Sequence, residues 1–83
     1  MKLTLTREML DALDQAVDKP DWLVARLAQL RAGPEPYLLS LNNQEMVALE
    51  ELCAMNIRFD ADGQVKPQHK PLDELSLMLM EQY

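Results

Sequence analysis

The chain has 83 residues, with eight Lys and Arg against fourteen Asp and Glu, so its net charge is −6. A hydrophobic fraction of 48% and a charged fraction of 27% are typical of one globular domain and argue against disorder. A chain of this length can bury only a small core, so its stability is low and self-association would add to it. The excess of acidic residues disfavours binding to a nucleic-acid backbone. Because the sequence has neither a long apolar run nor a signal-peptide pattern, we expect a cytoplasmic protein without membrane contact.

The first predicted element is an amphipathic helix over residues 7–18. Thr6 is the expected N-cap, because its hydroxyl oxygen can accept from a first-turn amide. The apolar stripe follows the 3.6-residue period and consists of Met9, Leu10, Leu13, Ala16 and Val17. The opposite face is acidic and is expected to bring together Asp11, Asp14 and Asp18. This face is either a solvated exterior or a patch that steers a basic partner during encounter.

A second helix is predicted over residues 22–32, with Asp21 as its N-cap. Pro20 separates it from the first helix, because proline disfavours helical backbone at the residue before it. The expected buried residues are Leu23, Val24, Leu27 and Leu30. Gly33 is expected to end the helix in the left-handed conformation. Trp22 falls off the apolar stripe, so it either folds over the end of the core or anchors a protein interface.

The start of the third predicted helix, residues 43–55, repeats the start of the first. Residues 39–42 read Leu-Ser-Leu-Asn where residues 3–6 read Leu-Thr-Leu-Thr. This similarity reflects either a duplication or two independent uses of a good helix-start signal. Asn42 is the expected N-cap, and Glu45 is placed for a capping box. Residues 37–41 form a strand or an extended lead-in, Asn56 is the expected C-cap, and the expected buried face is Met46, Leu49, Leu52 and Cys53.

Residues 57–66 are predicted to form a β-hairpin, in which Gly63 supplies the positive φ of a three-residue loop. The loop sequence Asp60-Ala61-Asp62-Gly63 partly matches a calcium-binding pattern. However, Arg58 stands at the first ligand position, and His69 stands where the pattern requires a bidentate Glu. We therefore expect a turn and no metal site.

Residues 71–83 allow two interpretations. Leu75, Leu77 and Leu79 alternate as in a strand, whereas a helical stripe would consist of Leu72, Leu75, Met78 and Leu79. The absence of β-branched residues and the abundance of Leu, Met and Glu favour the helix. In that helix Leu77 and Met80 lie outside the core stripe, so the segment is apolar on more than one face. Such a helix is either central in the core or covered by another chain, and we expect the second.

The expected fold is mainly α within the α+β class: about four short helices, one small β-hairpin and room for one further short strand. A winged-helix arrangement has the same order of elements. In it, residues 43–55 would be the recognition helix, yet their charged residues are Glu45, Glu50 and Glu51. A large sheet is not expected, because the chain has only one Ile, two Thr and four Val.

The sequence contains no recognisable catalytic set. Its two glycines are 30 residues apart, and neither Cys53 nor His69 has a partner at a metal-ligand or nucleophile–base spacing. We expect no catalytic activity, no metal and no cofactor.

The leading hypothesis is a small acidic protein-interaction module (adaptor, inhibitor or regulatory subunit) that forms a homodimer or binds a protein partner of basic character, and not nucleic acid. The alternative is a winged-helix-like, nucleic-acid-binding transcriptional regulator. The expected partner-binding residues are Leu77, Met80, Met78, Trp22, Asp11, Asp14 and Asp18.

Overall fold

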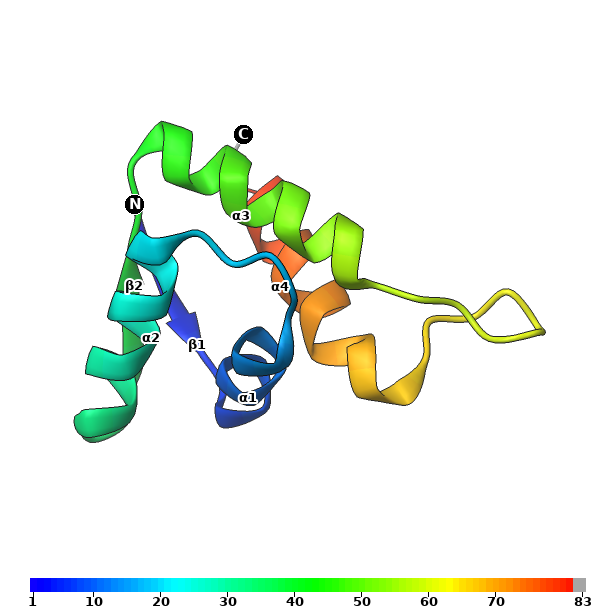
Figure 1. Ribbon diagram of the computed structural model, residues 1–83, viewed down its shortest axis with the longest axis horizontal. Helices are drawn as coiled ribbons and strands as arrows, with labels where there is room; N and C mark the ends of the chain where they lie inside the picture. Colours follow the sequence, from blue (N-terminus) through cyan, green and yellow to red (C-terminus); the bar gives the residue numbers. More distant parts are fainter. Residues whose placement is uncertain (82–83) are drawn as a thin grey trace.

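The computed structural model describes residues 1–81 and contains four α-helices and a two-stranded antiparallel sheet (Figure 1). The helices are α1 (Arg7–Gln15), α2 (Asp21–Ala32), α3 (Asn43–Asn56) and α4 (Lys70–Met80), and a short 3₁₀ helix, Pro67–His69, leads into α4. The strands are β1 (Lys2–Leu5) and β2 (Tyr37–Ser40). The predicted class, mainly helical with a small β component, is confirmed. Residues 82–83 of the last predicted helix lie outside the described part of the chain.

The two repeated start segments overlap the two strands of the sheet: β1 includes residues 3–5 of the first segment, and β2 ends at Ser40, within the second. Leu3 pairs with Leu39, and Leu5 pairs with Tyr37. The three leucines point into the core with exposed fractions of 1–3%, while the residues between them are exposed, as strand alternation requires. No strand was predicted at residues 2–5. Residues 2–5 form a strand because β2 supplies the partners for their backbone hydrogen bonds. The local sequence pattern of residues 2–5 does not show that residues 37–40 will pair with them.

Both helix start signals adopt the predicted capping geometry. The Met9 N–H donates to the Thr6 hydroxyl oxygen at 3.1 Å. At the start of α3, the Glu45 N–H donates to the Asn42 side chain at 2.8 Å, and the Asn42 N–H donates to the Glu45 carboxylate at 2.9 Å. This capping box satisfies amides that have no partner within the helix.

α1 ends at Gln15, earlier than the predicted residue 18. The backbone becomes extended at Ala16, and Asp18 adopts a positive φ of 61°. The Val17 N–H donates to the Asn56 side-chain oxygen at 2.9 Å, and the Asn56 amide donates back to the Val17 carbonyl at 3.3 Å. These bonds replace the next helical turn, so Val17 is 60% exposed and not part of the buried stripe. Asn56 itself is the last residue of α3, not its C-cap.

Three predictions for α2 are wrong. The helix includes Asp21, and Pro20 occupies the N-cap position. Val24 is 48% exposed, because α2 packs mainly against β2 and α1 and so covers only a narrow face. Gly33 has a φ of −103°, so α2 does not end in the left-handed conformation. Pro34 ends it instead, by disfavouring helical backbone at Gly33.

The core forms where α4 packs against both α1 and α3. Leu13, Leu49 and Leu75, one from each of these helices, are all fully buried. The segment Lys70–Met80 is an α-helix, so the helical interpretation of this sequence is confirmed.

The predicted hairpin protrudes from one end of the molecule (Figure 1). Phe59 bridges to Val65, and Gly63 has the predicted positive φ of 79°. The Asp60 carboxylate accepts the N–H groups of Asp62 and Gln64 at 2.9 and 3.0 Å, so it organises the turn. The hairpin does not join the sheet, in which β2 pairs with β1, and the winged-helix resemblance is not confirmed.

Cys53 should be chemically inert in the folded protein. It is fully buried, and desolvation, together with the nearby charge of Glu50, raises the pKa of its thiol to about 12. Because the thiolate is the reactive form, we expect no reaction with Ellman's reagent at mildly alkaline pH and one equivalent of reaction after unfolding in urea. Rapid reaction of the native protein would contradict this burial.

Candidate functional site

α4 presents two large apolar side chains to solvent. Its core residues Leu72, Leu75 and Leu79 have exposed fractions of 0–2%, whereas Leu77 and Met80 are 53% and 54% exposed. The two exposed residues are one turn apart on the same face, and we call them the α4 patch. Met78 lies at the border of this face, partly buried against the core. The structure thus places Leu77 and Met80 outside the core stripe, where the helical periodicity predicted them.

Carboxylates surround the α4 patch. Helical spacing places Asp73 and Glu74 one turn before Leu77, and Glu81 one turn after it. The cation on this face, Lys70, lies two turns before Leu77 at the start of the helix. The α4 patch is therefore a small apolar centre with a mostly acidic rim.

The three aspartates of the predicted acidic face do not form one patch. Arg31 of α2 bonds to the carboxylates of both Asp11 and Asp14, and these bonds raise the pKa of its guanidinium. Asp18 lies beyond the end of α1, so its predicted position on the helix is wrong. Asp11 and Asp14 consequently connect α1 to α2, and part of their charge is neutralised within the molecule.

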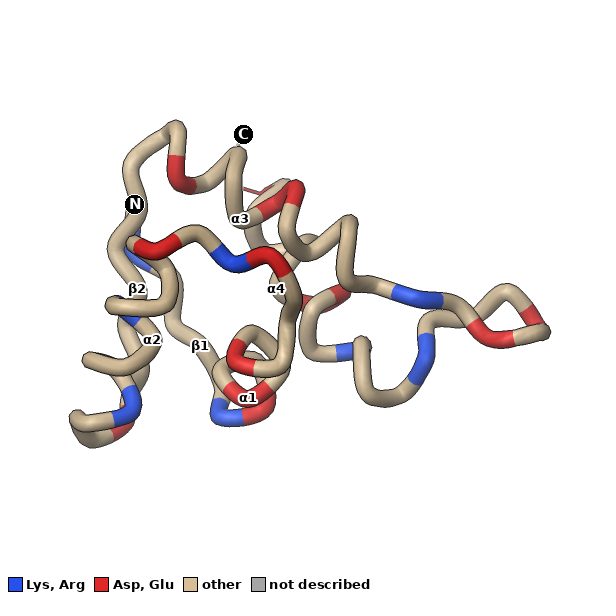
Figure 2. Tube along the Cα trace, viewed as in Figure 1, with Lys and Arg blue, Asp and Glu red and all other residues tan. Residues whose placement is uncertain are grey.

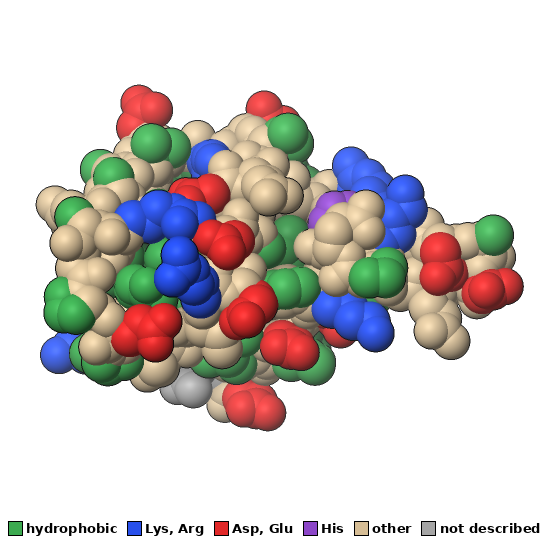
Figure 3. All heavy atoms as spheres, turned by 90° about the horizontal axis from the view of Figure 1, so that it is seen from below, with side chains coloured by type: hydrophobic (Ala, Val, Ile, Leu, Met, Phe, Trp, Pro, Cys, Tyr) green, Lys and Arg blue, Asp and Glu red, His purple; other side chains and the backbone are tan. Residues whose placement is uncertain are grey.

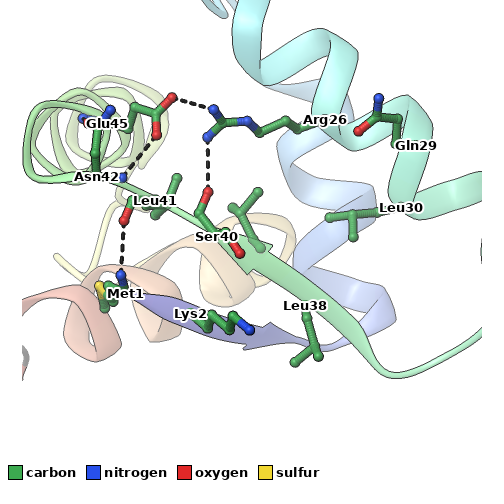
Figure 4. Close-up of a pocket in the computed structure, with 11 residues that line it drawn as sticks. Met1, Lys2, Arg26, Gln29, Leu30, Leu38, Ser40, Leu41, Asn42 and Glu45 are labelled. Carbon is green, nitrogen blue, oxygen red and sulfur yellow. Dashed lines mark hydrogen bonds and ion pairs between the residues drawn. The ribbon is translucent and has the colours of Figure 1, made fainter.

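Trp22 is partly buried against the core. The guanidinium of Arg26, one turn along α2, lies 5.0 Å from the centre of the indole ring. The same guanidinium donates to the Ser40 carbonyl at 2.9 Å and pairs with Glu45 at 2.6 Å (Figure 4). This arrangement favours packing over the core as the role of Trp22. The prediction overlooked Arg26, although its spacing of four residues from Trp22 was a usable signal.

An open groove of about 570 Å³ adjoins this network, between α2, β2 and the start of α3 (Figure 4). Its walls include apolar side chains from Leu30 and Leu38, and polar ones from Lys2 and Gln29. Glu45, the carboxylate that lines it, is engaged by Arg26 and by the Asn42 N–H. The Glu45 carboxylate is therefore held within the fold and is not free to act as an acid or base in the groove.

Glu45 should make the stability of the protein sensitive to acid. Hydrogen bonds from Arg26 and from the Asn42 N–H lower the pKa of its carboxyl in the folded state. Glu45 therefore stabilises the fold above its unfolded-state pKa, about 4.3, and this contribution is lost as the pH falls through the folded-state pKa. We expect Glu45→Gln to destabilise the protein at neutral pH and to flatten its acid dependence in urea-unfolding curves, compared with the exposed control Glu35→Gln. Identical profiles for both variants would refute this role.

No protein-family model, no curated protein and no solved structure matches the chain. Among residues 1–81, no helix is both long enough and apolar enough to cross a membrane, and no group of three or more His, Cys, Asp or Glu could hold a metal ion.

Proposed function

We propose that the protein is a small cytoplasmic protein-interaction module, without catalytic activity of its own, that binds its partner through the α4 patch. The observation that supports this proposal is the exposure of Leu77 and Met80 on a helix whose other leucines are fully packed. Adjacent apolar side chains with a polar rim are typical of interaction sites. Methionine adds a flexible side chain that adapts to irregular partner surfaces. The module would act as an adaptor, an inhibitor or a regulatory subunit.

The rim favours a basic partner over a second copy of the chain. Pairing two α4 helices about a two-fold axis brings acidic rims together, because Asp73, Glu74 and Glu81 all lie within one turn of Leu77, while Lys70 is farther away. Like charges in such contacts are destabilising. A partner helix with apolar residues at i and i+3 or i+4, flanked by Lys or Arg, matches both the apolar centre and the rim. The homodimer is therefore the competing arrangement.

Capture from an extract of the native host tests this proposal. The immobilised proteins are the wild type, the variant Leu77→Lys/Met80→Lys and the control Val24→Lys/Val47→Lys. The two control valines are 48% and 46% exposed on α2 and α3, and both variants change the net charge equally. A partner with a basic amphipathic segment should be retained by the wild type and the control and lost from the α4 variant. Equal retention by all three proteins would contradict the proposal.

Sedimentation of the purified wild type separates the two arrangements. A monomer at high concentration agrees with a heterologous basic partner. If the wild type is a dimer and Leu77→Lys/Met80→Lys is a monomer, the partner of the α4 patch is a second copy of the chain.

A further inference from the structure

We infer that the base of the hairpin is a separate docking site, for a short acidic segment of a protein partner. The site consists of Arg58, Lys66, His69 and Lys70, and we call it the basic cluster. It lies at the start of α4, where Lys70 is two turns from Leu77, and it depends on charged side chains and not on the apolar side chains of the α4 patch. The inference is therefore independent of the proposed function.

Backbone hydrogen bonds hold the basic cluster together. The Lys66 N–H donates to the Arg58 carbonyl at 2.9 Å, and the His69 N–H donates to the Lys66 carbonyl at 2.8 Å. The Arg58 N–H donates to His69 Nδ1 at 3.0 Å, so Nε2 is the ring nitrogen left to act as a donor. Lys70 follows directly. Figure 2 shows Lys and Arg positions around the root of the hairpin, and Figure 3 shows Lys and Arg side chains beside the histidine.

The cations of this cluster are not neutralised within the described part of the chain. Three of the eight Lys and Arg residues are located here. Arg26 and Arg31 form ion pairs with carboxylates, whereas Arg58 donates to the carbonyls of Met55 and Ile57, and neither Lys66 nor Lys70 forms an ion pair among residues 1–81. An acidic protein thus keeps a local concentration of positive charge, which attracts an anionic group in solution.

The surroundings of the basic cluster limit the size of the anion. Asp60 and Asp62 occupy the hairpin tip, and Asp73 lies in the first turn of α4. A nucleic acid, with charge repeated along its whole length, would pass close to these carboxylates and be repelled. A short peptide with two or three closely spaced carboxylates carries its charge over a short length and would not have to pass them. Strand alternation places Phe59 on the opposite face of the hairpin from Arg58, so it is not part of this site.

Fluorescence anisotropy at low salt tests the inference, with a short fluorescein-labelled peptide of alternating Glu and Ser as the probe. We compare the wild type with Lys66→Glu/Lys70→Glu and with the control Lys2→Glu/Arg7→Glu. Lys2 and Arg7 are exposed outside the basic cluster, and both variants change the net charge equally. Arg58 is left in place because it bonds to carbonyls at the end of α3.

We expect the wild type and the control to bind the Glu-Ser peptide, and the Lys66/Lys70 variant to bind about tenfold more weakly. A Gln-Ser peptide should not bind. The variant Leu77→Lys/Met80→Lys should still bind the Glu-Ser peptide, so this experiment tests the basic cluster separately from the α4 patch. Absence of binding by the wild type, or equal losses in the two Glu variants, would overturn the inference. Tighter binding of a single-stranded oligonucleotide of equal charge would also overturn it, in favour of nucleic acid.

Discussion

Replacing Leu75 with Ala should lower the free energy of unfolding by about 2–5 kcal/mol. Leu75 is fully buried in α4, which packs against both α1 and α3, so truncation leaves a cavity that close-packed neighbours cannot fill. For a domain of this size, such a loss is a large fraction of the total stability. Urea unfolding followed by circular dichroism measures the change.

The matched control is Leu77→Ala, the same truncation on the same helix at a side chain that is 53% exposed. We expect its effect to stay within about 0.5 kcal/mol, because little packing is lost at a solvated position. Similar losses for both truncations would contradict the division of α4 into a buried face and an exposed one.

The variant Leu77→Lys/Met80→Lys should remain folded and lose its partner. Both side chains are more than half exposed, so the new charges remain solvated, and the nearby carboxylates Asp73, Glu74 and Glu81 can pair with them. The change removes the apolar centre and repels a basic partner, so we expect binding to weaken by about 2 kcal/mol or more, roughly 30-fold. Circular dichroism reports folding, and titration with the captured partner reports affinity.

Unfolding of this double variant would show that Leu77 and Met80 are buried, because an unpaired buried charge is among the costliest single changes. Unchanged affinity in a folded variant would place the partner elsewhere. The control Val24→Lys/Val47→Lys accounts for the effect of added positive charge alone.

Features that depend on residues close in sequence could be predicted. The caps at Thr6 and Asn42 involve amides three residues away, and the hairpin turn at Gly63 is equally local. The exposure of Leu77 could be predicted from the helical period, because this residue lies outside the stripe of leucines that packs into the core. Local chemistry therefore determined where most elements begin and how α4 divides into two faces.

Features that depend on distant residues could not be predicted from one sequence. α1 stops where Asn56 bonds to Val17, across a separation of 39 residues. The acidic face loses part of its charge to Arg31, which is located on another helix. The basic cluster depends on the hairpin register, which brings Arg58 and Lys66 together across a separation of eight residues. Charged sites in this protein were thus harder to predict than its apolar face.

An NMR titration can measure whether the α4 patch binds a basic amphipathic helix. The ¹⁵N-labelled protein is titrated with a synthetic helical peptide that has a Leu stripe flanked by Lys. Binding at the α4 patch should give saturable chemical-shift changes concentrated at residues 73–81, which are absent for a peptide of the same composition with its Leu positions scrambled. Changes centred on the groove between α2 and β2, or no saturable change at all, would contradict it.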